Sequence, residues 1–136
     1  VENLVGAEGA AFSQTMRQLE HERGGIDRLV SNHALYRSAL ERADRSDPVV
    51  RQRIAALETA YQVGRILVIR EVLRQAPNGF SAATKCFCTE HEWRVAQFVA
   101  SAFGPEAMLW SDLTRGLTYA PGYTIMGGTS NVMRNV

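Results

Sequence analysis

A glycine pair followed by hydroxyl residues, close to the C-terminal end of the sequence, could bind an anion through its backbone. The run reads Gly127-Gly128-Thr129-Ser130-Asn131, and the residues after it are typical of a helix. Thr129 or Ser130 can cap that helix, and the glycines let a ligand approach the backbone N–H groups closely. Such a turn suits an oxyanion or a phosphate, although many helices that bind nothing begin in the same way.

A carboxylate, Glu22, lies at the edge of an apolar stripe in the first predicted helix. It follows Leu19 by three residues and precedes Ile26 by four, so we expect it to border the buried face. The positions one helical turn away hold no cation that could pair with it. A poorly hydrated carboxylate becomes more basic, so Glu22 is a candidate general base. The alternative is an ordinary glutamate on a helix surface.

Four helical segments must position these residues. The expected helices cover roughly 9–42, 48–76, 81–103 and 129 onwards, with a short helical piece at about 108–114. Asp47 caps the second helix with Pro48 at its first position, and Ser81 can cap the third. Gly24-Gly25 either bends the first helix or marks a close packing point. No strand-like alternation is present, so we predict an all-α, up-down-up-down four-helix bundle whose last helix is truncated.

Apolar residues at helical spacing define the faces that we expect to be buried. In the first helix they are Phe12, Met16, Leu19, Arg23, Ile26, Val30 and His33. In the second they are Ile54, Leu57, Tyr61, Arg65/Ile66, Val68/Ile69 and Leu73, and in the third Cys88, Trp93, Ala96 and Val99/Ala100. Helices of about thirty residues are about 45 Å long, so we expect them to pack on other subunits or domains as well.

The composition bounds the class of protein. The sequence has 136 residues, of which 46% are apolar, and a net charge of +1, which predicts one globular domain over 1–136 and no nucleic-acid partner. No apolar run is long enough to span a membrane, and no signal segment is present, so we expect a cytoplasmic protein. The sequence opens without Met and stops inside its last predicted helix, which suggests a fragment of a larger protein.

The two cysteines do not predict a disulfide or a metal site. Cys86 and Cys88 are separated by one residue, so on a helix they point to different sides, and we expect free thiols. Together with His91 they would still lack a fourth zinc ligand, so we expect no metal.

The motifs together resemble the C-terminal helical domain of the acyl-CoA dehydrogenases. The opening run 2–12 is similar to the family's Glu-Asn-Leu-Leu-Gly-x-Glu-Gly-x-Gly-Phe, and 16–23 is similar to its first long helix. The run 126–134 resembles the family's (Tyr/Gly)-(Glu/Gly)-Gly-Thr-Ser-(Glu/Gln)-Ile-x-Arg signature. Between roughly 40 and 115 only helix lengths and turns agree.

The resemblance implies an FAD enzyme that removes the α and β hydrogens of an acyl-CoA thioester. Its electrons would pass to an electron-transfer flavoprotein or a similar acceptor, and it would assemble as a homo- or hetero-oligomer, a dimer of dimers. Members carry an N-terminal helical domain and a β-domain, both absent here, so the isolated chain should be inactive. The alternatives are a non-catalytic dehydrogenase-like subunit and a helical oligomerisation module.

The position of the catalytic base is the most specific implication of the resemblance. Many members use a Glu directly before the Gly-Thr pair, where this sequence has Gly127. A smaller group, similar to the isovaleryl- and long-chain enzymes, has Gly there and a base before the Arg of the first long helix, which Glu22-Arg23 matches. The resemblance therefore implies Glu22 as base, Arg23, Gly127 and Gly128 as substrate-binding residues, and Thr129, Ser130 and Asn131 as FAD contacts.

Two departures from the family pattern fall on contacts to a neighbouring subunit's cofactor. The region 36–48 lacks the family's Arg-x-x-Phe-Gly segment, and 102–107 replaces its Gln-x-x-Gly-Gly-x-Gly loop. These losses resemble the actinobacterial enzymes built from two unlike subunits with half the usual FAD sites, some of which act on steroid side chains. Fatty acid or steroid catabolism is the role that the resemblance implies.

Overall fold

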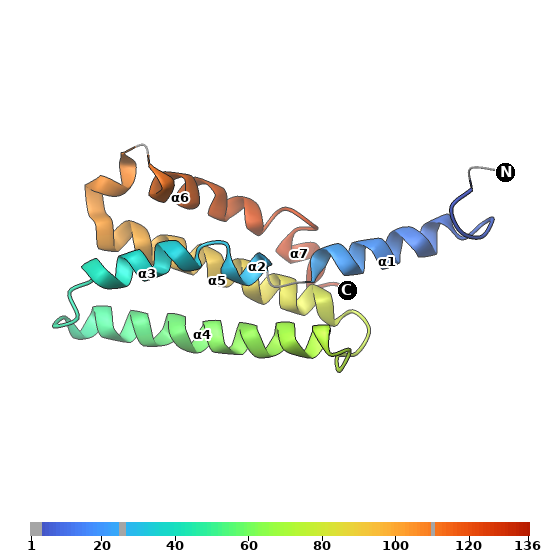
Figure 1. Cartoon of the computed structure of the whole chain (residues 1–136), viewed down its shortest axis with the longest axis horizontal. Coiled ribbons are helices and arrows are strands. Elements are labelled where there is room, and N and C mark those ends of the chain that lie inside the picture. The colour runs from blue at the N-terminus through green and yellow to red at the C-terminus, as the bar shows by residue number, and fades with distance from the viewer. Residues whose placement is uncertain (1–3, 25–26, 110) are drawn as a thin grey trace.

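The computed structural model in Figure 1 describes residues 4–24, 27–109 and 111–136. Its helices are α1 (Ala11–Arg23), α2 (Asp27–Val30), α3 (His33–Arg42), α4 (Pro48–Val72), α5 (Phe80–Phe103), the 3-10 helix η1 (Gly104–Met108), α6 (Asp112–Tyr123) and α7 (Ser130–Met133). No strand occurs within these described ranges, which confirms the expected all-α class.

Helix α5 is the centre of the bundle, because α3, α4 and α6 all pack against it. Successive helices of the bundle run in alternating directions, and α1 extends away from them (Figure 1). The up-down-up-down arrangement is therefore confirmed, but its fourth member is α6. We expected the helix beginning near residue 129 in that role, and α7 is only four residues long. The helical piece expected at 108–114 is instead η1 followed by the twelve-residue α6.

The start of α4 follows the local chemistry of its sequence. Asp47 Oδ1 accepts a hydrogen bond from the Val49 N–H at 2.8 Å, and Pro48 occupies the first helical position, as predicted. The predicted cap of α5 is wrong, since the N-cap is Gly79 and no side chain caps this helix. The φ of Gly79 is +78°, which only glycine adopts readily, so the turn itself sets the start of α5.

The first predicted helix is three helices, and its apolar stripe is only partly buried. Helix α1 ends at Arg23, where Gly24 turns extended, and a second break at residues 31–32 separates α2 from α3. Phe12 is 79% exposed and Met16 is exposed too, so the expectation of burial fails in the first half of α1, whereas Leu19 is partly buried and Arg23 is buried as predicted. Ile26 and Gly25 lie outside the described residues.

The main core lies where α3, α4, α5 and η1 meet. Its buried members are Tyr36, Ala39, Leu57, Val95, Phe98, Val99, Phe103 and Ala107. The inward face of α4 runs through Leu57, Ala60, Gly64 and Val68, so the expected burial of Ile66, Ile69 and Leu73 is wrong. On α5, Cys88, Ala96 and Val99 are buried as predicted, whereas Trp93 faces outward because the inward face passes through its neighbour Glu92.

Candidate functional site

The glycine turn predicted from the sequence lies between α6 and α7. Gly127 and Gly128 have φ angles of +67° and +96°, a region that other residues rarely adopt. A Cβ added at Gly128 would lie 2.5 Å from Cε of Met133, so there is no room for a side chain. The N–H of Ser130 donates to the Thr124 carbonyl at 3.0 Å, which closes the turn. This backbone therefore requires glycine at 128.

The predicted cap of the last helix is confirmed. Thr129 Oγ1 accepts a hydrogen bond from the Val132 N–H at 3.2 Å, and α7 begins at Ser130. The amide N–H groups of Gly127, Gly128 and Thr129 find no acceptor among the described residues. Three such donors in succession on a glycine turn can bind an oxyanion or a phosphate oxygen.

A buried lysine, Lys85, lies beneath this turn. Its side chain is 0% exposed, and Nζ donates to the Gly128 carbonyl at 2.6 Å and to the Thr124 carbonyl at 3.3 Å. Sequence reasoning missed this residue. The available signal was a lone lysine among small and apolar residues of the third predicted helix, at 82–88, where a cation needs buried acceptors.

Helix α7 is attached to the first half of α5 by side chains as well. Cys86 Sγ lies 3.5 Å from the Ser130 carbonyl oxygen, which accepts its hydrogen bond. Met133 is buried in a small apolar cluster with Ala82 and Cys86. Arg134 forms an ion pair with Glu90 of α5. The turn and α7 thus rest on three successive turns of one helix.

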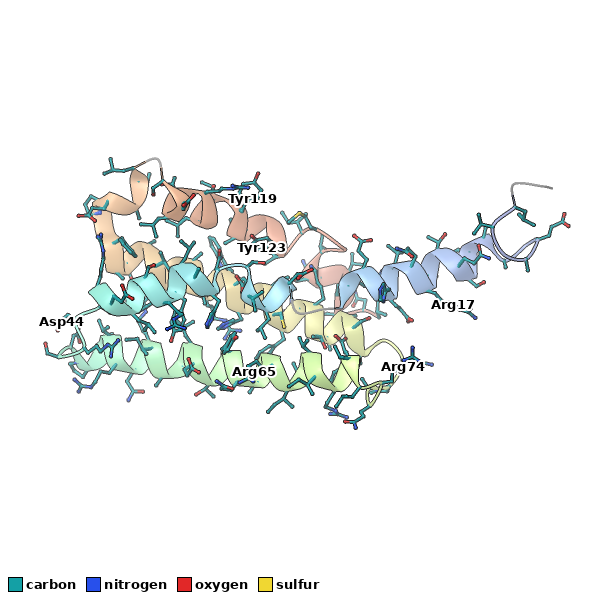
Figure 2. The ribbon with its side chains drawn as sticks, viewed as in Figure 1. Arg17, Asp44, Arg65, Arg74, Tyr119 and Tyr123 are labelled. Carbon is teal, nitrogen blue, oxygen red and sulfur yellow. The ribbon has the colours of Figure 1, made fainter. Side chains whose placement is uncertain are left out.

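Glu22 and Arg23 lie at the C-terminal end of α1, and only Arg23 is buried there. Glu22 is exposed, so the poorly hydrated environment expected for its carboxylate is absent in this chain. The physical reason is the direction of α1, which leaves the bundle and carries residues such as Arg17 out beyond α4 and α5 (Figure 2). Nothing in the described chain covers the outer side of α1.

The end of α1 and the glycine turn lie at the same end of the bundle. A Cβ on Gly24 would be 3.2 Å from Oε2 of Glu71, in the last turn of α4. Helix α5 starts at that end, because it runs antiparallel to α4, and its first turns carry the glycine turn on Lys85 and Cys86 (Figure 1). The structure therefore brings the Glu22–Arg23 segment and the turn to one region of the molecule.

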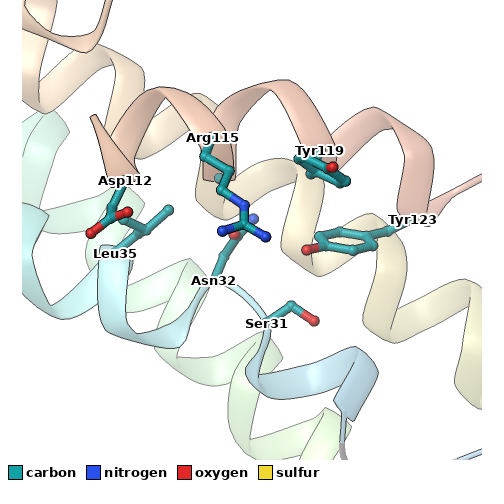
Figure 3. Close-up of a pocket in the computed structure, with 8 residues that line it drawn as sticks. Ser31, Asn32, Leu35, Asp112, Arg115, Tyr119 and Tyr123 are labelled. Carbon is teal, nitrogen blue, oxygen red and sulfur yellow. The ribbon is translucent and has the colours of Figure 1, made fainter. Parts of the chain in front are cut away.

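A cavity of about 410 Å³ lies beside this region, between α6 and the break that separates α2 from α3 (Figure 3). Its lining residues are Ser31, Asn32, Leu35, Asp112, Arg115, Gly116, Tyr119 and Tyr123. Arg115, Tyr119 and Tyr123 follow each other at intervals of four, so they share one face of α6. This spacing is typical of a helix, but we expected none beyond about residue 114. The Arg115 guanidinium and the phenol groups of Tyr119 and Tyr123 suit a polar ligand group in this cavity.

The buried ionisable groups elsewhere belong to the interior of the bundle. Burial raises the pKa of Glu92 to about 8, although a hydrogen bond from the Asn32 N–H opposes this. Burial, with the nearby Arg94 adding to it, lowers the pKa of His91 to about 4. Both cysteines are free, as predicted, and burial raises the pKa of Cys88 to about 12. Across the described ranges, no three His, Cys, Asp or Glu side chains are grouped to hold a metal.

The chain is therefore an α-helical domain in which a glycine turn rests on the central helix and offers backbone N–H donors at one end of the bundle. The family profile described as acyl-CoA dehydrogenase, C-terminal domain, matches residues 9–136. The chain therefore belongs to the acyl-CoA dehydrogenase family, whose members are FAD enzymes. Among curated proteins and solved structures, none matches the chain. No helix in the described part of the chain is long and apolar enough to cross a membrane.

Proposed function

We propose that this chain is the C-terminal domain of an FAD-dependent acyl-CoA dehydrogenase that performs α,β-dehydrogenation of an acyl-CoA thioester. The proposed site residues are Glu22 as the base, Arg23, Gly127 and Gly128 for the substrate, and Thr129, Ser130 and Asn131 for FAD. One observation carries the proposal: a turn with three amide donors, for which the described part of the chain offers no acceptor, lies at the same end of the bundle as the Glu22–Arg23 segment.

The turn fits the acidic groups of the cofactor and the substrate. Its N–H groups can donate to pyrophosphate oxygens, and the side chains of Thr129 and Asn131 are exposed for further contacts. The close approach of a ligand is possible because Gly127 and Gly128 carry no side chains. When bound, FAD supplies the acceptor for the β-hydrogen, which leaves as hydride.

The chain's own residues would handle the α-proton. The α-carbon of a thioester is a weak acid, so abstraction needs a base with a raised pKa and a donor for the developing enolate oxygen. Gly127 N–H is the proposed donor and the Glu22 carboxylate the proposed base. Because Glu22 is exposed in this chain, the proposal requires another part of the protein, such as the expected N-terminal helical and β-domains, to cover it and exclude water.

The outer face of α4 supports assembly into an oligomer. It exposes a series of large apolar residues, namely Val63, Ile66, Ile69, Val72 and Leu73. Exposed large apolar residues that gather on one helix are typical of an interface with another subunit. We propose a homo- or hetero-oligomer, a dimer of dimers. The departures from the family pattern in the regions 36–48 and 102–107 favour an unlike subunit as the partner. A cytoplasmic location and an electron-transfer flavoprotein as acceptor complete the proposal.

The replacement of Glu22 by Gln in the full-length protein, together with its partner subunit, tests the function. We expect the rate of flavin reduction by acyl-CoA to fall at least about 1,000-fold, because the amide cannot accept the proton while substrate binding persists. Glu20→Gln is the matched control, since Glu20 is also exposed on α1. An unchanged reduction rate in the Glu22 variant would show that the base is elsewhere.

The exposure of Glu22 favours a second candidate, a non-catalytic dehydrogenase-like subunit whose bundle serves assembly. The two proposals differ in a direct measurement. Under the first proposal, the bleaching of flavin absorbance by acyl-CoA in the purified full-length complex should depend on Glu22. Under the second, flavin bleaching in the complex would be independent of Glu22 and would be lost only with substitutions in the partner.

A further inference from the structure

We propose that Lys85 is a positioning residue for the glycine turn: its buried ammonium holds the Thr124 and Gly128 carbonyls toward the bundle, so that the Thr129 N–H faces the ligand. This inference rests on the proposed function for its ligand, but its structural part stands on the contacts of Lys85 alone. Two of the contacts of Lys85, 2.6 Å to Gly128 O and 3.3 Å to Thr124 O, span both ends of the turn.

Because the peptide bond is planar, the direction of one residue's carbonyl fixes the direction of the next residue's N–H. In a trans peptide, the C=O of one residue and the N–H of the next point in opposite directions. The Gly128 carbonyl points at Lys85 Nζ, so the Thr129 N–H points away from α5. With no ammonium beneath it, the peptide between Gly128 and Thr129 could rotate through ψ of Gly128, because glycine is permissive at this torsion.

Lys85 is buried, so its ammonium depends on acceptors inside the protein. The side chain is 0% exposed, and an ion that is removed from water needs strong partners to remain charged. A hydrogen bond from an ammonium to a carbonyl is about twice as strong as a neutral one. The ammonium also places a positive charge on the side of the Gly128–Thr129 peptide opposite to the Thr129 N–H, which favours an anion at that N–H.

The other contacts of the turn do not fix the same peptide. The Ser130 N–H donates to the Thr124 carbonyl, and the Cys86 thiol donates to the Ser130 carbonyl. Met133 packs beside Gly128 without a hydrogen bond. Of the described residues, Lys85 is the side chain that reaches the Gly128 carbonyl. The orientation of the Thr129 N–H therefore depends on it.

The test uses the full-length protein with its partner subunit and compares Lys85→Met with Thr89→Val. Methionine keeps an unbranched side chain of nearly the same length, which lacks the terminal ammonium. Thr89 is also 0% exposed and lies one turn further along α5, where its hydroxyl donates to the Lys85 carbonyl. Its replacement by valine therefore perturbs the same helix at the same depth and leaves the ammonium in place. Lys85→Gln is a second variant for the case in which Lys85→Met does not fold.

Two readouts separate this inference from the proposed function. Amide hydrogen exchange by mass spectrometry should rise at least about tenfold within 124–130 in the Lys85 variant, with α3 and α4 unchanged. The dissociation constant of FAD for the apoprotein should rise about tenfold, because misdirected amides lose a ligand contact. The Thr89 variant should match the parent in both measurements.

Each outcome decides one of the two claims. Unchanged exchange within 124–130 overturns the role of Lys85, whatever the activity of the protein. Faster exchange with an unchanged FAD dissociation constant also overturns it, since the turn would then not be positioned for the ligand. A parent that binds no FAD overturns the proposed function, while the exchange measurement still decides whether Lys85 holds the turn.

Discussion

The main-chain N–H of Asn32 donates to Oε2 of Glu92 at 2.6 Å, and the Asn32 side-chain amide donates to the Glu92 carbonyl at 3.3 Å. This pair joins the break between α2 and α3 to the middle of α5. Glu92 is 1% exposed and Asn32 is 1% exposed, so the carboxyl group interacts with backbone in the dry interior. The break is therefore held by a specific acceptor and is part of the folded structure.

The first prediction concerns the pH dependence of stability through Glu92. Its folded pKa of about 8 lies above the ordinary value of 4.5, so the folded state binds the extra proton between these values. Stability from this group is fully present below pH 4.5 and is lost as pH rises through 8. Glu92→Gln keeps an acceptor for the Asn32 N–H. It should remove the contribution of Glu92 to the fall in the free energy of unfolding with pH, which is up to about 1.4 kcal/mol per pH unit. Urea titrations of both proteins between pH 5 and 8 measure this, with exposed Glu41→Gln as control. Parallel curves would contradict it.

His91 should give the opposite dependence. Its folded pKa of about 4 lies below the ordinary 6.5, so the unfolded chain binds the proton in this range. Stability from this group is present above pH 6.5 and is lost as pH falls through 4. His91→Leu should therefore flatten the loss of stability between pH 6.5 and 4, as followed by thermal unfolding. In the parent protein, the His91 contribution to stability rises with pH between pH 4.5 and 6.5, whereas the Glu92 contribution falls over the same range. A His91→Leu profile as steep as the parent's would refute the assignment.

Gly64 of α4 lies against Leu29 of α2. A Cβ there would lie 2.6 Å from Cδ1 of Leu29 and 3.6 Å from Sγ of Cys88. Gly64→Ala should therefore lower the free energy of unfolding by about 1–3 kcal/mol through overpacking, in spite of the better helix propensity of alanine. Gly122→Ala in α6 is the matched control, because its nearest neighbour would be Met126 Cε at 3.8 Å. Equal stability of the two variants in urea would refute the packing argument.

The cap of α4 should contribute measurably to stability. Asp47→Ala removes the acceptor of the Val49 N–H and should cost about 1 kcal/mol, measured as a shift of the urea midpoint at constant m-value. Asp47→Ser offers another side-chain acceptor at the cap and should recover most of the loss. If serine and alanine give the same midpoint, the cap is not the cause.

Local chemistry determined which parts of the fold were predictable. The start of α4 at Asp47-Pro48 depends on a cap and a proline, and both act within three residues. Helix α6 was missed because Gly116 and Pro121 oppose a helix locally, and its packing on α5 outweighs them. The break at Asn32 could not be foreseen, since its acceptor lies sixty residues away on another helix.

The same distinction holds for the candidate site. The glycine turn and its Thr129 cap were visible because glycine and hydroxyl residues act on their own backbone. Lys85 was not visible, because its role depends on carbonyls that approach it only in the folded bundle. The environment of Glu22 was predicted wrongly for this chain, since an apolar stripe indicates a buried face without telling which element covers it.

The reactivity of the Cys88 thiol reports whether the bundle is folded. Its thiol is 0% exposed between α2, α4 and α5, and the thiolate that reacts with alkylating reagents is suppressed by a pKa of about 12. Modification must therefore await separation of these helices, after which the thiol reacts like that of a free amino acid. The rate at which an alkylating reagent labels Cys88 should therefore report how often these helices separate, with no label engineered into the protein.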